Sequence, residues 1–213
     1  QNIDCWENPK NINHEKMKPT LVFATANENK VSEVRRLLEG QFEVKSLVDI
    51  GCFEDIPETA LTLEGNAKQK ADYVKEKYGF DCFADDTGLE VDALDGAPGV
   101  FTARFGGPQK DAMQNMNHLL NELRSAGAEE SMDRQAQFKT AIHLIVDGAE
   151  IALEGICKGE IAKKRSGTEG FGYDPIFIPE GESRTFSEMN ADEKNAISHR
   201  GRAIRKMTEW LGA

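Results

Sequence analysis

The stretch FDCFADDTG, residues 80–88, sets an apolar run directly before two adjacent carboxylates. Residues 80–84 are typical of a buried strand. We expect this strand to bring Asp85 and Asp86 to the carboxyl end of a sheet, where ligands bind in α/β folds, and Gly88 to permit a sharp turn there. Neighbouring carboxylates are costly in such a place unless they are paired or hold a metal, and Mg²⁺ favours oxygen ligands. A solvated acidic turn is the alternative.

The segments around this stretch predict an α/β fold with a mixed central sheet. Two strand–helix units come first, with strands at 20–25 and 42–47 and helices after Asn27 and over about 63–79. A glycine-rich loop at 96–107 and a helix around 116–123 follow. Residues 138–146 alternate like a long strand, Asp147-Gly148 predicts a tight hairpin turn, and the return strand covers about 150–157. A short strand at 175–178 and a helix from about Ser198 complete the order, which indicates flanking helices around a mixed sheet.

Composition excludes several classes of protein. The chain has 213 residues and a formal net charge of −11, which does not favour non-specific binding to nucleic acid or anionic membranes. No apolar run approaches the roughly 20 residues of a membrane span. We therefore expect neither nucleic acid nor a membrane as a partner. The four cysteines lie far apart without a CxxC pair, which is typical of reduced thiols in a cytoplasmic protein. Residues 1–16 are polar and aperiodic, so we expect an N-terminal tail there and one domain over residues 17–213.

Three further groups of residues carry candidate chemistry. The first lies where the strand at 20–25 turns into a helix, because free backbone N–H groups and the helix dipole favour an anion at such a point. The side chains of Asn27 and Lys30 add donors to phosphate. An ordinary N-cap followed by a surface lysine is the alternative. The whole stretch is Thr25, Ala26, Asn27, Glu28, Asn29 and Lys30.

The second group is the loop GTEGFGYDP, residues 167–175, in which glycines let the backbone approach a ligand closely. Phe171 and Tyr173 offer flat surfaces for stacking on a base, and Asp174 can accept a hydrogen bond from a ring N–H. The alternative is a loop with two aromatic rings in the core.

The third group is Lys194 with Ser198-His199-Arg200, at the start of the last helix. Cations in a first turn oppose the helix dipole, so a ligand with carbonyl or phosphate oxygens would explain them. A solvated basic helix start is the alternative.

Five segments in this order resemble the inosine triphosphate pyrophosphatase family, also called XTP/dITP diphosphohydrolases. The resemblance covers about residues 18–212. It implies an elongated α/β fold with two lobes and a nucleotide-binding cleft between them, a homodimer and a requirement for Mg²⁺. The chain departs from common family residues at Ala26, Gly65 and Glu169. The matching segments are ATANENK (24–30), PETALTLEGNAKQKA (57–71), ADDTGLEVDALDGAPGVFTARF (84–105), GFGYDPIF (170–177) and KNAISHRGRA (194–203).

The resemblance also implies roles for individual residues. Asp86 is similar to the family's catalytic proton acceptor and metal ligand, Glu58 to a second metal ligand, and Asp85 to the partner of Asp86. We expect both Asp85 and Asp86 to be catalytic, since Asp86, or Asp85 beside it, can orient the attacking water or accept its proton. Triphosphate contacts are implied for Thr25, Asn27, Lys30 and Lys70, within the substrate-binding stretch at 25–30. Contacts to substrate or nucleoside are implied for Thr87, Phe171, Gly172, Tyr173, Asp174, Lys194, His199 and Arg200.

The expected activity is hydrolysis of ITP, dITP and XTP to the monophosphate and pyrophosphate, which clears these nucleotides before they enter DNA or RNA. Two other readings stay open. One is a pyrophosphatase for modified pyrimidines or methylated bases, for which GFGYDP together with ISHR is not expected. The other is a nucleotide sensor without catalysis, against which Asp85, Asp86 and Glu58 argue.

Overall fold

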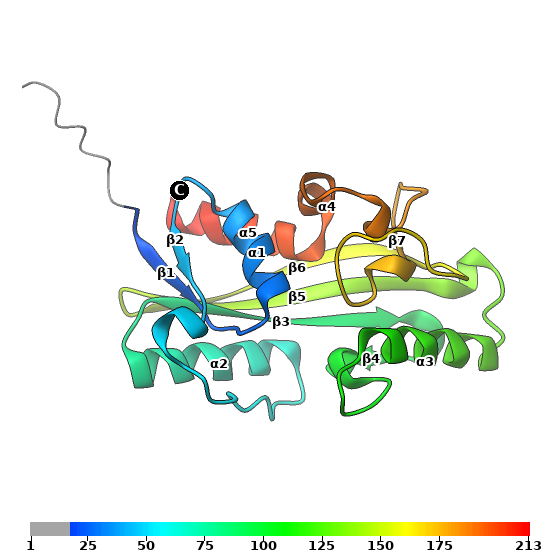
Figure 1. The fold of residues 1–213 in the computed structure, drawn as a ribbon, viewed down its shortest axis with the longest axis horizontal. Coiled ribbons are helices and arrows are strands. Elements are labelled where there is room, and N and C mark those ends of the chain that lie inside the picture. Colours follow the sequence, from blue (N-terminus) through cyan, green and yellow to red (C-terminus); the bar gives the residue numbers. More distant parts are fainter. Residues whose placement is uncertain (1–17) are drawn as a thin grey trace, which may run out of the picture.

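A seven-stranded mixed sheet forms the centre of the protein (Figure 1). The computed structural model describes residues 18–213, so the predicted tail at 1–16 lies outside the described residues. The sheet order is β2-β1-β3-β5-β6-β7, with β4 paired to β3. β2, β1 and β3 are parallel, whereas β3, β5, β6 and β7 pair antiparallel. The predicted mixed α/β sheet is therefore confirmed. The strands are β1 Thr20–Phe23, β2 Glu43–Lys45, β3 Cys82–Val91, β4 Pro98–Gly99, β5 Gln135–Val146, β6 Ala149–Ile161 and β7 Phe177–Pro179.

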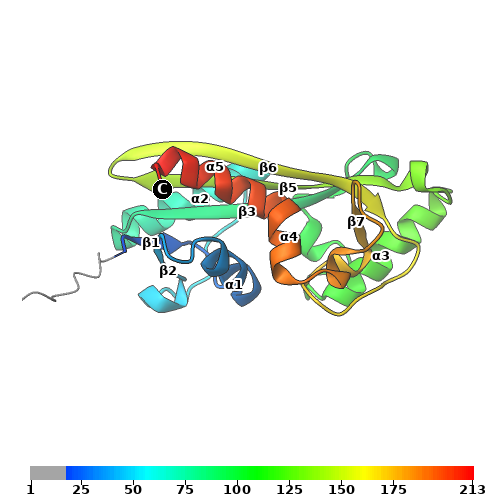
Figure 2. The same ribbon diagram turned by 90° about the horizontal axis from the view of Figure 1, so that it is seen from above.

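Within residues 18–213, five α-helices cover the two faces of this sheet. α2 and α3 lie on one face, and α1, α4 and α5 lie on the other (Figures 1 and 2). The short elements α4 and β4 were not expected from the sequence, because seven and two residues are too few to show a hydrophobic period. The helices are α1 Glu28–Leu37, α2 Leu63–Tyr78, α3 Ala112–Ser125, α4 Ala191–Ile197 and α5 His199–Leu211.

Apolar side chains pack in two regions along the length of the sheet. In the first, β1, β3 and β5 lie between α1 and α5 on one face and α2 on the other. Phe23 and Phe83 stack there with ring centroids 4.5 Å apart. In the second, Leu119 of α3, Phe138 of β5 and Phe177 of β7 belong to one buried cluster. The long strands β3, β5 and β6 run through both regions, which gives the molecule its elongated shape in Figures 1 and 2.

β3 does not end at the two acids, and the prediction of a strand end with a turn at Gly88 is wrong. β3 continues to Val91 because β5 pairs with it antiparallel over its whole length, from Cys82↔Ile145 to Val91↔Ala136. Gly88 lies inside this strand. A Cβ on it would stand 2.9 Å from the carbonyl oxygen of Gly99, so the close approach of β4 explains the glycine.

Local signals in the sequence mark several element boundaries correctly. Asn27 caps α1 and Ser198 caps α5, each through its side chain. Gly79 ends α2 with φ of 75°, the left-handed conformation that glycine favours. The hairpin turn between β5 and β6 has φ of 49° at Asp147 and 79° at Gly148, as a type I′ turn requires. The short strand expected at 175–178 begins later, at β7, after one 3₁₀ turn over Asp174–Ile176.

Candidate active site

The two acids of β3 lie at an open edge of the sheet. The parallel pairing of β1 with β3 ends at Phe23↔Phe83, and β4 pairs only with Leu89 and Glu90. Residues 84–88 of β3 therefore have no strand on that side within the described part of the chain. The chain leaves β1 at this point and enters α1 (Figure 1), which puts the predicted phosphate-binding turn beside the acids.

Asp85 and Asp86 point to opposite faces of the sheet, because successive side chains of a strand alternate. Asp85 faces α1 and α5, and Asp86 faces α2. The two acids are neighbours in sequence, but they are not a carboxylate pair that shares one partner. We expected the two acids to act on each other as a pair. Instead, each carboxylate has its own partners on its own face of the sheet.

Asp85 is buried between two cations. Its Oδ1 lies 2.8 Å from Lys30 Nζ, and its Oδ2 lies 2.9 Å from Arg200 Nε. Burial alone would raise the pKa of Asp85, but Lys30 and Arg200 outweigh it and hold the pKa well below its usual range. Asp85 is thus a fixed negative charge that positions two cations.

The charges continue from Asp85 as an alternating chain toward the aromatic loop. Arg200 Nη1 lies 2.6 Å from Glu33 Oε2, and Lys194 Nζ bridges Glu33 and Asp174 at 2.6 Å each. The chain connects β3, α1, α5, α4 and the loop before β7. Its members, in order, are Lys30, Asp85, Arg200, Glu33, Lys194 and Asp174.

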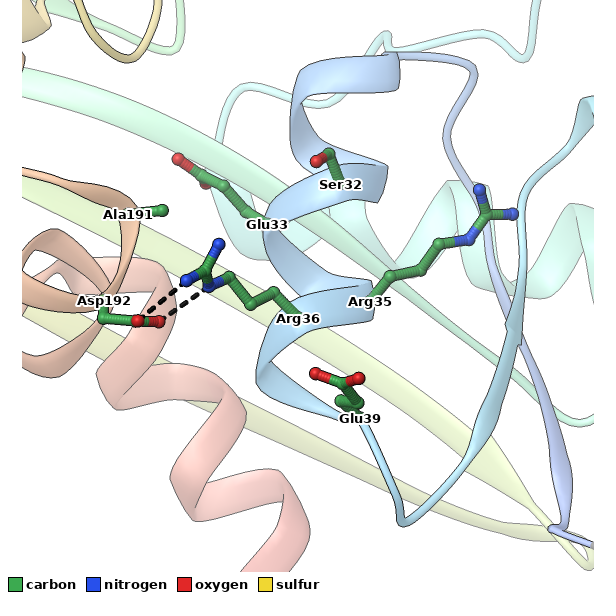
Figure 3. A pocket seen from close by; sticks show the side chains of 7 residues that line it. All are labelled: Ser32, Glu33, Arg35, Arg36, Glu39, Ala191 and Asp192. Carbon is green, nitrogen blue, oxygen red and sulfur yellow. Dashed lines mark hydrogen bonds and ion pairs between the residues drawn. The ribbon is translucent and has the colours of Figure 1, made fainter.

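The sequence did not single out Glu33. It lies one turn after Lys30 on α1, and a lone glutamate on a helix gives no signal of a buried partner. A groove of about 710 Å³ between α1 and α4 runs past it, where Arg36 pairs with Asp192 (Figure 3). This groove lies beside the chain of charges and includes neither acid of β3.

Asp86 lies in a different setting. Its Oδ2 accepts a hydrogen bond from Asn66 Nδ2 at 3.0 Å, and its Oδ1 accepts one from the backbone N–H of Thr87. Burial raises the pKa of Asp86 above its usual range, and the charges of Lys70 and Lys30 do not cancel this effect. A half-buried carboxylate with a raised pKa is a suitable proton acceptor.

Glu58 and Lys70 form an ion pair beside Asp86. Burial would raise the pKa of Glu58, but Lys70 and Lys30 hold it below its usual range. The charges of the same two lysines favour the ionised form of both acids: they help to hold the pKa of Asp85 low, and they oppose, without cancelling, the rise that burial causes in the pKa of Asp86. They therefore act on both faces of β3 at its open edge.

The predicted phosphate-binding turn is only partly free for an anion. Asn27 Oδ1 accepts from the N–H groups of Asn29 and Lys30, and Thr25 Oγ1 accepts from the N–H of Asn27. The ordinary N-cap is thus present. The alternative of a surface lysine is wrong, because Lys30 reaches the buried Asp85. The remaining residues of the turn are exposed: Ala26, Glu28 and Asn29.

The two aromatic rings of the 167–175 loop differ. Tyr173 is buried in the core, and its hydroxyl donates to the carbonyl of Thr102 at 2.9 Å, so it does not offer a free stacking surface. Phe171 is half-buried, with Lys194 Nζ 4.8 Å from its ring centroid. Its backbone N–H donates to Asp174, and Gly172 follows with φ of 63°. Of the two rings, Phe171 is the less buried.

The cations near the start of α5 have partners inside the protein. Lys194 belongs to α4, and Arg200 pairs with Asp85 and Glu33 and donates to Thr87 Oγ1 at 3.2 Å. These acids explain why cations are tolerated near a helix N-terminus, so neither a ligand nor a solvated helix start is required.

His199 is buried as well, with its ring stacked on Phe138 at 4.5 Å. Burial, with Arg200 and Lys194 nearby, holds the pKa of His199 well below its usual range, so the ring is neutral at pH 7. Its Nδ1 has no hydrogen-bond partner among the described residues, which leaves one polar atom of this ring unsatisfied.

The arrangement agrees with a known family. The Ham1 family model matches residues 21–210. This chain belongs to the Ham1 family. It is 54% identical over 193 residues to a dITP/XTP pyrophosphatase of Flavobacterium johnsoniae, with 91% of this chain and 98% of that protein covered. A dITP/XTP pyrophosphatase of Bacillus subtilis is 42% identical over 194 residues, with 90% and 96% covered. The predicted family resemblance is confirmed.

Solved structures of Ham1 proteins share the fold. The Coxiella burnetii HAM1 protein superposes with a TM-score of 0.81 at 35% identity, covering 91% of this chain and 98% of that one. The Staphylococcus aureus Ham1 protein gives a TM-score of 0.78 at 33% identity, with the same coverage. In this Ham1-family chain, no α-helix among residues 18–213 has the length and apolar character needed to span a bilayer.

Besides Glu33, the structure places two further residues against the predicted site residues of this Ham1-family chain. Asn66 lies within the TLEGNAKQK segment, and it is buried with its amide directed at Asp86. Thr140 of β5 is buried and forms a 2.7 Å hydrogen bond with Thr87. Both are polar residues at positions of a helix or strand that face the core, and this placement is the sequence feature that could have indicated them.

Proposed function

We propose that this chain hydrolyses dITP, XTP and ITP to the nucleoside monophosphate and pyrophosphate. The observation that carries the proposal is the open edge of β3, where Asp86 has a raised pKa and Lys30 and Lys70 act from both faces. The names of the relatives support the substrate class, and hydrolysis at the α–β anhydride fits a site that combines one proton acceptor with several cations.

In the proposed reaction Asp86 accepts a proton from the attacking water. The water oxygen forms a bond to the α-phosphorus. The bond between that phosphorus and the oxygen that bridges it to the β-phosphorus breaks, and pyrophosphate leaves with the bridging oxygen. Lys30 and Lys70 stabilise the charge that develops on the phosphates. Asp85 does not take part in proton transfer in this proposal, because Lys30 and Arg200 occupy its two oxygens and hold its pKa well below the usual range, which makes it a weak base.

We also propose that Asp86 and Glu58 hold Mg²⁺. Both are oxygen donors, and burial together with the charge of Glu58 raises the pKa of Asp86, so a cation held by the two carboxylates would relieve both effects. Mg²⁺ typically uses one or two carboxylates together with waters and substrate phosphates. When bound, it would supply neutralisation of phosphate charge and polarisation of water.

Base selection is proposed for the aromatic loop and the start of α5. The half-buried ring of Phe171 is proposed to stack on the base, and neutral His199 has a nitrogen without a partner among the described residues. Hypoxanthine and xanthine present a 6-keto acceptor next to an N–H donor, whereas adenine reverses both groups. A site whose buried polar groups bind the 6-keto and N–H groups of hypoxanthine and xanthine rejects adenine, because those groups of the protein would then have no hydrogen-bond partners.

A substrate panel tests this proposal. The chain is incubated with ITP, dITP, XTP, GTP, ATP and dUTP in the presence of Mg²⁺, and pyrophosphate and orthophosphate are measured separately. We expect pyrophosphate from the first three and loss of turnover with EDTA. Orthophosphate as the sole product, or equal rates with dUTP, would refute the proposal, and binding without turnover would favour a sensor.

The family resemblance also leads us to propose a homodimer that acts in the cytoplasm. Light scattering during gel filtration measures the molar mass. A mass near 23.6 kDa would contradict the dimer.

A further inference from the structure

A second cluster of ligand-type side chains lies away from the open edge of β3, on the α2 face of the β5–β6 hairpin. It consists of Asp72 of α2, His143 of β5 and Glu150 of β6. One ligand atom from each lies within 4.8 Å of the others, and among residues 18–213 no other group of three His, Cys, Asp or Glu side chains meets this criterion. His143 Nε2 lies 3.2 Å from Glu150 Oε2.

The register of the hairpin explains why these side chains meet. His143 pairs with Ala152 across the two strands. Glu150 lies two residues before Ala152 and therefore points to the same face as His143, as a diagonal neighbour. α2 packs over β5 on this face and contributes Asp72. The cluster thus joins three elements that are far apart in sequence.

A lysine already acts as the cation of this cluster. Lys68 Nζ lies 3.1 Å from Asp72 Oδ1 and 2.9 Å from Glu150 Oε2. Its side chain is 48% exposed, and exposed ion pairs contribute little to stability. Lys68 can therefore turn toward solvent and leave the two carboxylates and the imidazole to another cation.

We propose that Asp72, His143 and Glu150 form a binding site for a transition-metal ion of the Zn²⁺ type, which competes with Lys68 for the two carboxylates. One imidazole nitrogen with two carboxylate oxygens suits Zn²⁺ better than Mg²⁺, because Mg²⁺ favours oxygen ligands alone. His143 is buried and fixed in the middle of the sheet, whereas Glu150 is exposed. The site therefore has one rigid ligand and an open side where water can complete the coordination.

Metal binding there would fasten α2 to the β5–β6 hairpin. The same helix carries Asn66 and Lys70 at the catalytic edge, but the metal site requires neither residue. The proposal is therefore independent of the proposed nucleotide hydrolysis.

Zn²⁺ titration of the full chain tests the site. The protein is stripped with EDTA and kept in millimolar Mg²⁺, which occupies carboxylate sites that use oxygen alone. Zn²⁺ is then added in a calorimeter, and thermal unfolding is followed in parallel. We expect one Zn²⁺ per chain together with a rise in Tm, because a ligand that binds only the folded state stabilises it.

Three variants separate this site from other Zn²⁺ ligands. His143→Gln should weaken Zn²⁺ binding at least about tenfold, since it removes the imidazole ligand. Lys68→Met should strengthen binding about two- to fivefold, because it removes the competing ammonium and its weak, exposed ion pairs. Lys75→Met is the matched control, since Lys75 lies on the same helix and forms a similar ion pair, with Asp81 just before β3. The Zn²⁺ affinity of this variant should not change.

The proposal is overturned if the chain binds no Zn²⁺, if His143→Gln binds as tightly as the unmodified chain, or if Lys68→Met gives no gain over Lys75→Met. Circular dichroism of each variant identifies a loss of fold. If His143→Gln does not fold, the comparison of Lys68→Met with Lys75→Met decides the question alone.

Discussion

Replacing Asn66 by alanine should slow turnover strongly while affecting stability only modestly. Asn66 Nδ2 donates to Asp86 Oδ2 at 3.0 Å, and Asn66 Oδ1 accepts from the backbone N–H of Ala60 at 2.9 Å. The amide therefore orients the proposed proton acceptor and connects it to the loop that carries Glu58. A hydrogen bond to a charged group contributes about 1.5–3 kcal/mol. If the transition state loses this amount, kcat falls about 10- to 100-fold.

Gln69 provides a matched control for this substitution. Its side chain holds the same loop, since its Oε1 accepts from the N–H groups of Thr59 and Ala60 and its Nε2 donates to Thr59 Oγ1. It has no contact with Asp86. Gln69→Ala should therefore lower the Tm to a similar extent as Asn66→Ala, but it should leave kcat within about threefold.

The assay follows pyrophosphate release from ITP at saturating substrate and Mg²⁺, with KM determined separately. A selective fall in kcat in Asn66→Ala supports an action through Asp86. Equal losses of kcat in the two variants would refute this reasoning, because Asn66 would then act only by holding the loop.

Three further results are expected. Asp86→Asn should lower kcat by about 10²-fold or more without a change in Tm, and ITP hydrolysis near the rate of the unmodified chain would contradict the assignment. Arg200→Ala leaves Asp85 and Glu33 buried without their shared cation, so urea unfolding should show a loss of about 3–5 kcal/mol; a loss below 1 kcal/mol would mean that water compensates both acids. Glu33→Gln should be destabilising at pH 7, but the difference from the unmodified chain should shrink as pH falls below about 4.5. The reason is that burial is outweighed by Arg200 and Lys194, which lower the pKa of folded Glu33, so its contribution exists above the pKa of the unfolded chain and is lost on acidification. A difference that stays constant from pH 7 to pH 3 would contradict this.

Several features of the fold follow from short-range physics, and the sequence predicted them. The cap at Asn27, the glycine end of α2 and the Asp147-Gly148 turn depend on a few neighbouring residues. The alternation in β5 and the apolar run before Asp85 likewise reflect the local environment of each strand. Motif order was sufficient to identify the family, because GFGYDP, ISHR and ADDTGL rarely occur together by chance.

The environment of each site residue depended on the tertiary structure. Adjacent acids appear as a pair in sequence, yet the pleat of β3 turns Asp85 to a fixed ion pair and Asp86 to a setting that raises its pKa. Tyr173 and Phe171 are two residues apart, but Tyr173 is buried in the core whereas Phe171 is only half-buried. A local sequence pattern shows which residue types are present. Burial and ion pairing, in contrast, depend on elements that come into contact only when the chain folds. For this reason, the sequence by itself determined the family, the order of elements and the resemblance that points to Asp86, and only the tertiary structure decided that Asp85 lies between two cations whereas Asp86 faces Asn66 on the other side of the sheet.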